Sequence, residues 1–183
     1  MYSRLKRLPR EFYERETLIV GRELLDKILV RKIGPKQLVA RIVDIECYKD
    51  RCDLGSYVVS KPHTAEPMFG HGGFSFVTVV HGHNLLNITT EKAGTAGAIL
   101  IRGIEPVSWK SEEKTDGPAK VARALLITRN LSGIDLTSSD QLSIFFPINP
   151  AHFEVVSSPR VHVKNKNPWR FCIKGKTDRH LKG

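Results

Sequence analysis

Short apolar runs rich in β-branched residues recur along this chain with turn signals between them, and this pattern constrains the fold more than any other feature. Residues 27–33 and 38–45 flank Gly34-Pro35, and residues 74–80 and 85–89 flank a polar turn. Runs paired in this way predict antiparallel hairpins. Further strands are expected at residues 98–104, 142–146, 153–156, 161–163 and 170–173.

Only two segments have the pattern of helices. Residues 16–26 place apolar side chains one helical turn apart, and residues 119–127 follow Gly117-Pro118, where a proline costs a helix nothing. Residues 50–73 are polar and aperiodic, which predicts a long loop. We therefore expect an α+β fold with a single domain over residues 1–183, built on a mixed, mainly antiparallel, partly rolled sheet with flanking helices and a protruding β-hairpin.

Charge is the part of the composition that bears on function. The chain has 29 Lys and Arg against 19 Asp and Glu, a net charge of +10. A basic protein is drawn to polyanions, and clustering of the excess favours nucleic acid over a membrane surface. The clusters are Arg4, Lys6, Arg7 and Arg10 at one end, and Lys164, Lys166, Arg170, Lys174, Lys176, Arg179 and Lys182 at the other.

The location of the protein follows from what the sequence lacks. No apolar run is long enough to cross a bilayer, and residues 1–7 have no apolar stretch of the signal-peptide type. We expect a soluble, intracellular protein, in the cytoplasm if its source is prokaryotic and in the nucleus if it is eukaryotic. Three cysteines at no zinc-like spacing predict free thiols.

A carboxylate and a phenol stand two residues apart where an apolar strand meets the long loop. Glu46 and Tyr48 share one side of that strand. If this side faces the interior, Glu46 enters a water-poor cleft and can act as a general base. The alternative is a surface glutamate in a salt bridge at the strand end. Both sides of the strand are apolar, so periodicity leaves the direction of Glu46 open.

Two other groups of residues could carry chemistry. Asn87 and Arg102 lie in apolar strands, where burying a polar side chain is costly unless it is paired. They could form a polar pocket that binds a ligand. Alternatively, both could have only a structural role. His81 and His83 at the hairpin turn, with Glu46, suggest a zinc or iron site as a less favoured alternative. A hairpin tip can also serve as a wedge in a nucleic-acid groove.

At these residues the sequence resembles the alkyladenine (3-methyladenine) DNA glycosylase family, the monofunctional enzymes of the mammalian type. The similar segments follow the family's order over most of the chain. They are Leu8–Tyr13, Ala40–Tyr48, Met68-Phe69 with Gly72-Gly73, the hairpin ending in Gly82, Leu86–Ile88, Leu100–Pro106, Gly117–Lys120 and Pro168–Gly175.

The resemblance implies a repair enzyme that flips an alkylated or deaminated purine out of duplex DNA and hydrolyses its N-glycosidic bond, with no cofactor, metal or lyase step. In the family, the residue matching Glu46 activates the water, the one matching Arg102 helps to hold it, and those matching Asn87 and Tyr48 form the pocket. His81 with Gly82 match the intercalating tip. We also expect Lys120 and Arg170 to contact the DNA backbone.

Three positions depart from the family. Tyr57 stands where a pocket histidine is usual, Thr78 where a pocket tyrosine is usual, and His81 where a tyrosine enters the vacated base position. The departures affect base reading and leave the water-activating residues intact. They predict a shifted lesion preference. They also favour the competing hypothesis, a catalytically impaired nucleic-acid binding module on the same fold.

Overall fold

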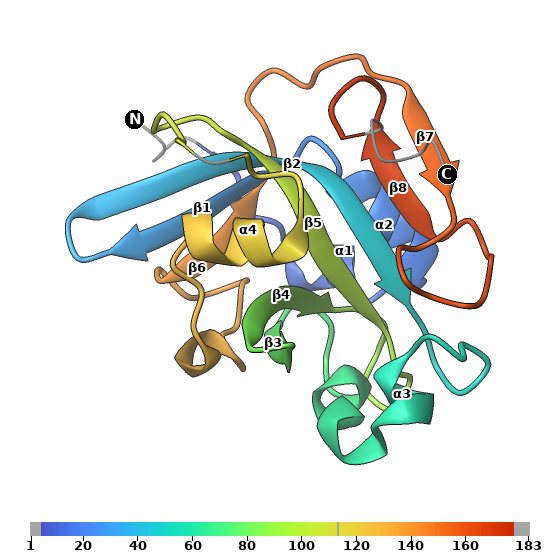
Figure 1. Cartoon of the computed structure of the whole chain (residues 1–183). Helices are drawn as coiled ribbons and strands as arrows, with labels where there is room; N and C mark the ends of the chain where they lie inside the picture. The colour runs from blue at the N-terminus through green and yellow to red at the C-terminus, as the bar shows by residue number, and fades with distance from the viewer. Residues whose placement is uncertain (1–4, 113, 178–183) are drawn as a thin grey trace.

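The computed structural model describes residues 5–112 and 114–177. Its strands form one sheet in the order β3-β4-β5-β2-β1-β6, with β8 also beside β2 and β7 beside β8. Figure 1 shows the sheet curling around its core. The strands are β1 (Ile28–Ile33), β2 (Lys36–Tyr48), β3 (Ser75–Val80), β4 (His83–Thr89), β5 (Ala98–Pro106), β6 (Leu142–Phe145), β7 (Val155–Ser158) and β8 (Arg170–Ile173).

This architecture confirms the expected α+β class with a rolled sheet. Every strand pairing in the described part of the chain is antiparallel, so the expectation of a mixed sheet was wrong there. Both predicted hairpins form, as β1–β2 and β3–β4.

Helices cover both faces of the sheet. Helices α1 (Arg10–Tyr13) and α2 (Thr17–Leu24) lie behind it in Figure 1, and α4 (Pro118–Ala124) lies in front. The predicted helix at residues 16–26 forms as α2 because the Glu16 side chain accepts the free N–H groups of Leu18 and Ile19. Every helix in the described residues is too short or too polar to span a bilayer.

Two local expectations were wrong. The predicted loop at residues 50–73 contains α3 (Tyr57–Ser60) and the 3-10 helix η1 (Pro62–Phe69). Here the Ser56 side chain caps α3, and the buried Val58, Ala65 and Met68 replace the missing periodicity with a local core. Another 3-10 turn, η2, spans Arg129–Leu131.

Residues 161–163 were predicted to be a strand and are not one. His162 has a φ of 58°, in the left-handed region. The Val161 N–H donates to the side chain of Glu46 rather than to a neighbouring strand. The hydrogen bond that a neighbouring strand would accept is thus accepted by a side chain. The prediction of a strand rested on the β-branched valines, which do not reveal this partner.

Paired bulges interrupt the register of β2 and β5 beside the catalytic candidates. The register passes from Ile42↔Ile104 to Asp44↔Gly103 and then to Ile45↔Ile101. Val43 is therefore an extra residue on β2, and Arg102 is an extra residue on β5. Both sides of β2 are buried around Glu46, so the apolar pattern of the sequence could not show which way its side chain points.

Candidate active site

A cavity of about 300 Å³ opens on the face of the sheet that α4 covers. Its walls come from the ends of β2 and β5, the β3–β4 hairpin, α3, the start of α4 and residues 161–163. All six residues predicted to be catalytic or pocket-forming line this one cavity, although they come from five separate elements. They are Glu46, Tyr48, Tyr57, Thr78, Asn87 and Arg102.

Glu46 lines this cavity and is completely buried. One carboxylate oxygen accepts the Tyr48 hydroxyl at 2.8 Å, and the other accepts the Val161 N–H at 2.7 Å. The Arg102 guanidinium lies 3.2 Å from the second oxygen. The carboxylate is thus held from three directions, and the alternative of a surface salt bridge does not apply.

Tyr48 remains a hydroxyl donor in this arrangement. Burial and then the negative charge of Glu46 raise the pKa of Tyr48 above its ordinary value. The phenol therefore stays protonated and remains the donor in its hydrogen bond to Glu46. Tyr57, the other tyrosine of the predicted pocket, comes from α3 and packs with Tyr48 against the small core beneath that helix.

Arg102 belongs to a row of alternating charges below the cavity. Its Nε lies 4.0 Å from Asp44 Oδ2 and has no hydrogen-bond partner among the described residues. Asp44 in turn binds the Arg170 guanidinium through both oxygens, at 3.1 and 2.7 Å. Each charge has a neighbour of opposite sign, which is the condition under which charges remain buried.

Arg170 cannot have the role that the sequence predicted for it. Its residue exposure is 2%, and its guanidinium is bound to Asp44. A side chain buried to this degree does not reach a DNA phosphate. We therefore correct its assignment from DNA contact to support of the charge row.

Asn87 and Thr78 form the wall that the β3–β4 hairpin contributes. Asn87 Nδ2 donates to the backbone oxygens of Phe76 and Leu85, at 3.0 and 3.3 Å, and to Thr78 Oγ1 at 3.2 Å. Because two carbonyl oxygens can only accept, they fix which way the amide is turned. Both side chains are buried, and both line the cavity.

The predicted wedge lies at the exposed turn of the same hairpin. His81 and Gly82 have φ angles of 48° and 77°, as the tight turn of a two-residue hairpin requires. His81, Gly82 and His83 are all exposed. In the described residues no group of three His, Cys, Asp or Glu side chains lies close enough to hold a metal ion, so the metal hypothesis finds no ligand cluster there.

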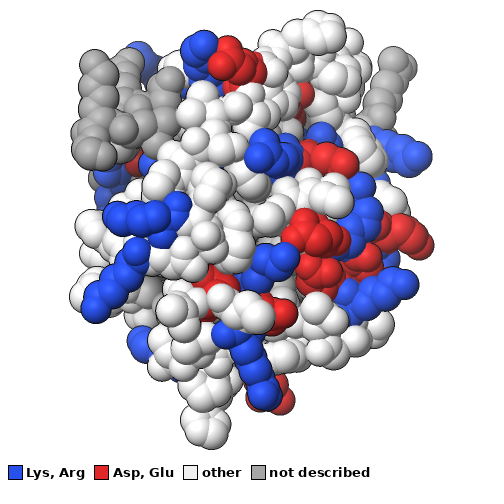
Figure 2. Space-filling model, turned by 90° about the vertical axis from the view of Figure 1, so that its right-hand side faces the viewer, with Lys and Arg blue, Asp and Glu red and all other residues white. Residues whose placement is uncertain are grey.

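Basic side chains flank the cavity. Figure 2 shows basic side chains with few acidic ones on its left half, the side of α4, whereas acidic side chains gather toward α1 and α2 on the right. Lys120 on α4 pairs with Asp116 at 2.7 Å and is partly exposed, and Lys164 and Lys166 are exposed beside residues 161–163. Arg4, Arg179 and Lys182 of the predicted basic clusters lie outside the described residues.

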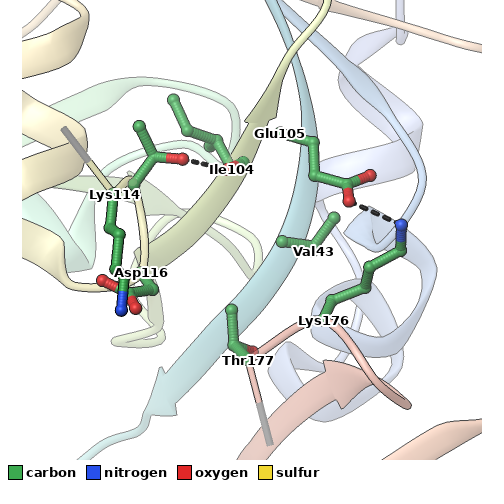
Figure 3. Close-up of a pocket in the computed structure, with 8 residues that line it drawn as sticks. Val43, Ile104, Glu105, Lys114, Asp116, Lys176 and Thr177 are labelled. Carbon is green, nitrogen blue, oxygen red and sulfur yellow. Dashed lines mark hydrogen bonds and ion pairs between the residues drawn. The ribbon is translucent and has the colours of Figure 1, made fainter. Parts of the chain in front are cut away.

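A second cavity, of about 230 Å³, lies at the other end of the bulged region (Figure 3). Glu105 and Lys176 point toward one another across it and pair at 2.5 Å. The Thr115 hydroxyl donates to the Ile104 carbonyl oxygen. None of the predicted site residues lines this cavity, and we assign the chemistry to the larger one.

Sequence reasoning missed three residues that line or support the site. Val161 supplies a hydrogen bond to Glu46, His162 lines the cavity, and Arg160 is buried behind Tyr48. Only one signal pointed to them: at residues 160–163, Arg160 and His162 alternate with two valines. Their contacts lie more than 100 positions away in the chain, at Glu46, Cys47 and Asp53.

Comparison with known proteins assigns the chain to a family. A profile described as Methylpurine-DNA glycosylase (MPG) matches residues 11–177. The chain belongs to the methylpurine-DNA glycosylase family. The family resemblance found in the sequence is thereby confirmed.

The chain also matches curated relatives along almost their whole length. A protein of Legionella pneumophila (strain Lens) is 36% identical over 178 residues, covering 93% of this chain and 96% of the relative. One of Methanocella arvoryzae is 38% identical over 187 residues, covering 91% and 92%. One of Borrelia garinii is 32% identical over 179 residues, covering 91% and 96%. The names of all three assign them provisionally as 3-methyladenine DNA glycosylases.

Proposed function

We propose that this chain is a monofunctional glycosylase that flips an alkylated or deaminated purine of the 3-methyladenine type out of duplex DNA and hydrolyses its N-glycosidic bond, starting base-excision repair. Family membership makes it a DNA glycosylase, which is a hydrolase acting on DNA. The proposal adds the lesion class, base flipping and the roles of individual residues. It places the protein where the cell keeps its DNA, in the cytoplasm of a prokaryote or the nucleus of a eukaryote.

The observation that carries the proposal is the completely buried Glu46 in the lining of a cavity that Tyr48 and Tyr57 also line. A base inside a duplex cannot reach a carboxylate that is completely buried, so the nucleotide must leave the stack. The cavity volume of about 300 Å³ suits a small flat ligand. Tyr48 and Tyr57 line the cavity, and electron-rich rings attract a positively charged alkylated purine.

Hydrolysis needs one water between Glu46 and the sugar C1′. Glu46 takes a proton from this water, whose oxygen forms the new bond to C1′ while the bond from C1′ to the base nitrogen breaks. The electron pair of that bond leaves with the base. Arg102, 3.2 Å from Glu46, holds the water and stabilises the ionised carboxylate. No lysine lines the cavity in the described residues, in keeping with water rather than an amine as the nucleophile.

The hairpin supplies the groups that read the base. Asn87 and Thr78 would contact the edge of the flipped purine and exclude guanine, and His81 with Gly82 would enter the space it vacates. Lys120 would exchange Asp116 for a DNA phosphate. Double-stranded DNA with a damaged purine is the expected partner.

Base release tests the proposal directly. Duplex oligonucleotides carrying 3-methyladenine, hypoxanthine or ethenoadenine are incubated with the protein in the presence of a chelator. We expect release of at least one base, an intact strand and an abasic site. Salt-sensitive binding to DNA without release of any base would favour the impaired binding module, which the departures at Tyr57, Thr78 and His81 suggest.

A further inference from the structure

Arg160 is a fully buried cation directly behind the proposed active site. Its Nη1 and Nη2 donate to the two carboxylate oxygens of Asp53 at 2.6 and 2.5 Å, and Nη1 also donates to the Cys47 carbonyl oxygen at 2.8 Å. One guanidinium therefore joins the end of β2, the loop before α3 and the segment that begins at residue 159. Neither side chain of the Arg160–Asp53 pair is exposed.

Two aromatic rings enclose the same guanidinium. Its Cζ lies 4.7 Å from the centre of the Tyr48 ring and 5.0 Å from that of the Trp169 ring. Burial alone lowers the pKa of Arg160, but the hydrogen bonds and charge of Asp53 outweigh it and hold the pKa above its ordinary value. Arg160 thus stays charged, and its planar fork matches both the carboxylate and the rings.

The residues attached to Arg160 are those that orient Glu46. Val161, its neighbour in the chain, donates its N–H to Glu46, and Tyr48, which stacks on it, donates its hydroxyl. The loop before α3 packs tightly against Arg160 at Gly55. A Cβ at Gly55 would lie 2.5 Å from Val163 Cγ1 and 3.0 Å from Arg160 Nη2.

We propose that Arg160 is a positioning residue for base hydrolysis, which together with Asp53 holds the two hydrogen-bond donors that orient Glu46. This inference rests on the proposed glycosylase function. It assigns no contact with DNA to Arg160, because the guanidinium is enclosed on every side. Its effect on catalysis passes through Val161, Tyr48 and Glu46.

Arg160→Lys separates positioning from binding. Lysine keeps the charge but loses the fork and the stacking, so the donors to Glu46 shift. We expect the single-turnover rate of base release to fall about 10- to 100-fold, as misplacement of catalytic groups does. The Kd for a lesion-containing duplex should change less than about twofold, since no phosphate contact is lost. Arg15→Lys is the control, because Arg15 binds Glu23, the Phe12 carbonyl oxygen and the Phe12 ring, away from the cavity.

Gly55→Ala tests the same idea without removing any charge. Gly55 lines the cavity, but its added methyl group would point at Val163 and Arg160, so the rate should fall more than the affinity for duplex. Gly70→Ala is the control, because a Cβ there meets only the Pro67 carbonyl oxygen at 3.4 Å. Circular dichroism melts show that each variant is folded at the assay temperature.

The outcomes distinguish the two proposals. A wild-type protein that releases no base overturns the proposed function and this inference with it. An active wild type, with Arg160→Lys and Gly55→Ala both at full rate, overturns the inference alone. Parallel losses of rate and binding in the two variants would make Arg160 a purely structural residue and also overturn it. A loss in rate alone supports the inference.

Discussion

Two regions of one cavity are built in different ways. The carboxylate end, defined as Glu46, Arg102 and the N–H of Val161, is held by contacts from separate parts of the chain. The hairpin wall, defined as Thr78, Asn87 and the turn at His81-Gly82, comes from two neighbouring strands and ends in solvent. Side chains of the hairpin wall can change without disturbing the residues proposed to cleave the bond. Of the three positions that the sequence alone sets apart from the family pattern, Thr78 and His81 lie in the hairpin wall and Tyr57 lies on α3.

The largest expected effect is on the rate of base release, at Glu46 in the carboxylate end. Glu46→Gln removes the proposed base but keeps the shape of the side chain, so base release should fall about 10²- to 10⁴-fold. Affinity for lesion-containing duplex should stay within about twofold, because phosphate contacts supply most of it. Single-turnover kinetics and fluorescence anisotropy measure the two quantities. Substantial release by this variant would remove Glu46 from the role of base.

At the tip of the hairpin wall, the expected change is in binding. His81→Asn removes the imidazole ring and preserves the turn, because asparagine tolerates a positive φ. Loss of one stacking contact should weaken binding to lesion-containing duplex about 5- to 100-fold. Single-stranded DNA has no stack to enter and should bind almost as before. The neighbouring exposed His83, replaced by alanine, is the control. Equal losses for duplex and single strand would contradict the wedge.

Inside the hairpin wall, selectivity should change more than rate. Thr78→Val keeps the shape of the side chain and removes the oxygen that accepts from Asn87, which retains its two carbonyl partners. One hydrogen bond is worth about 0.5 to 1.5 kcal/mol, so the ratio of rates between two lesions should shift about 2- to 10-fold. Competition between hypoxanthine and ethenoadenine duplexes measures this ratio. An unchanged ratio would mean that Thr78 does not read the base.

The smallest effect is expected at the rim. Lys120→Gln should weaken duplex binding severalfold and reduce the slope of log K against log salt by about one, equally for damaged and undamaged DNA. A salt titration by anisotropy measures the slope. Lys32→Gln, an exposed change on β1, is the control. An unchanged slope would mean that Lys120 binds no phosphate and stays paired with Asp116 in the complex.

Local patterns predicted the fold well where a single element carried its own signal. The β1–β2 and β3–β4 hairpins, α2 and the strand at residues 98–106 follow from period and turn residues alone. The helices at residues 57–69 escaped prediction because a capping serine and a small local core, not periodicity, stabilise them. The same limit explains why residues 161–163 were mistaken for a strand.

By itself, the sequence determined the α+β class, the family and the six residues that meet in the cavity. The tertiary structure decided how those residues can act. It buried Glu46, supplied Val161 as its donor, and buried Arg160 and Arg170 against Asp53 and Asp44. Turn chemistry and side-chain period act over a few residues, whereas Arg160 and Asp53 are 107 positions apart and Arg170 and Asp44 are 126 apart. Whether a charge faces DNA or a buried partner depends on contacts at that range.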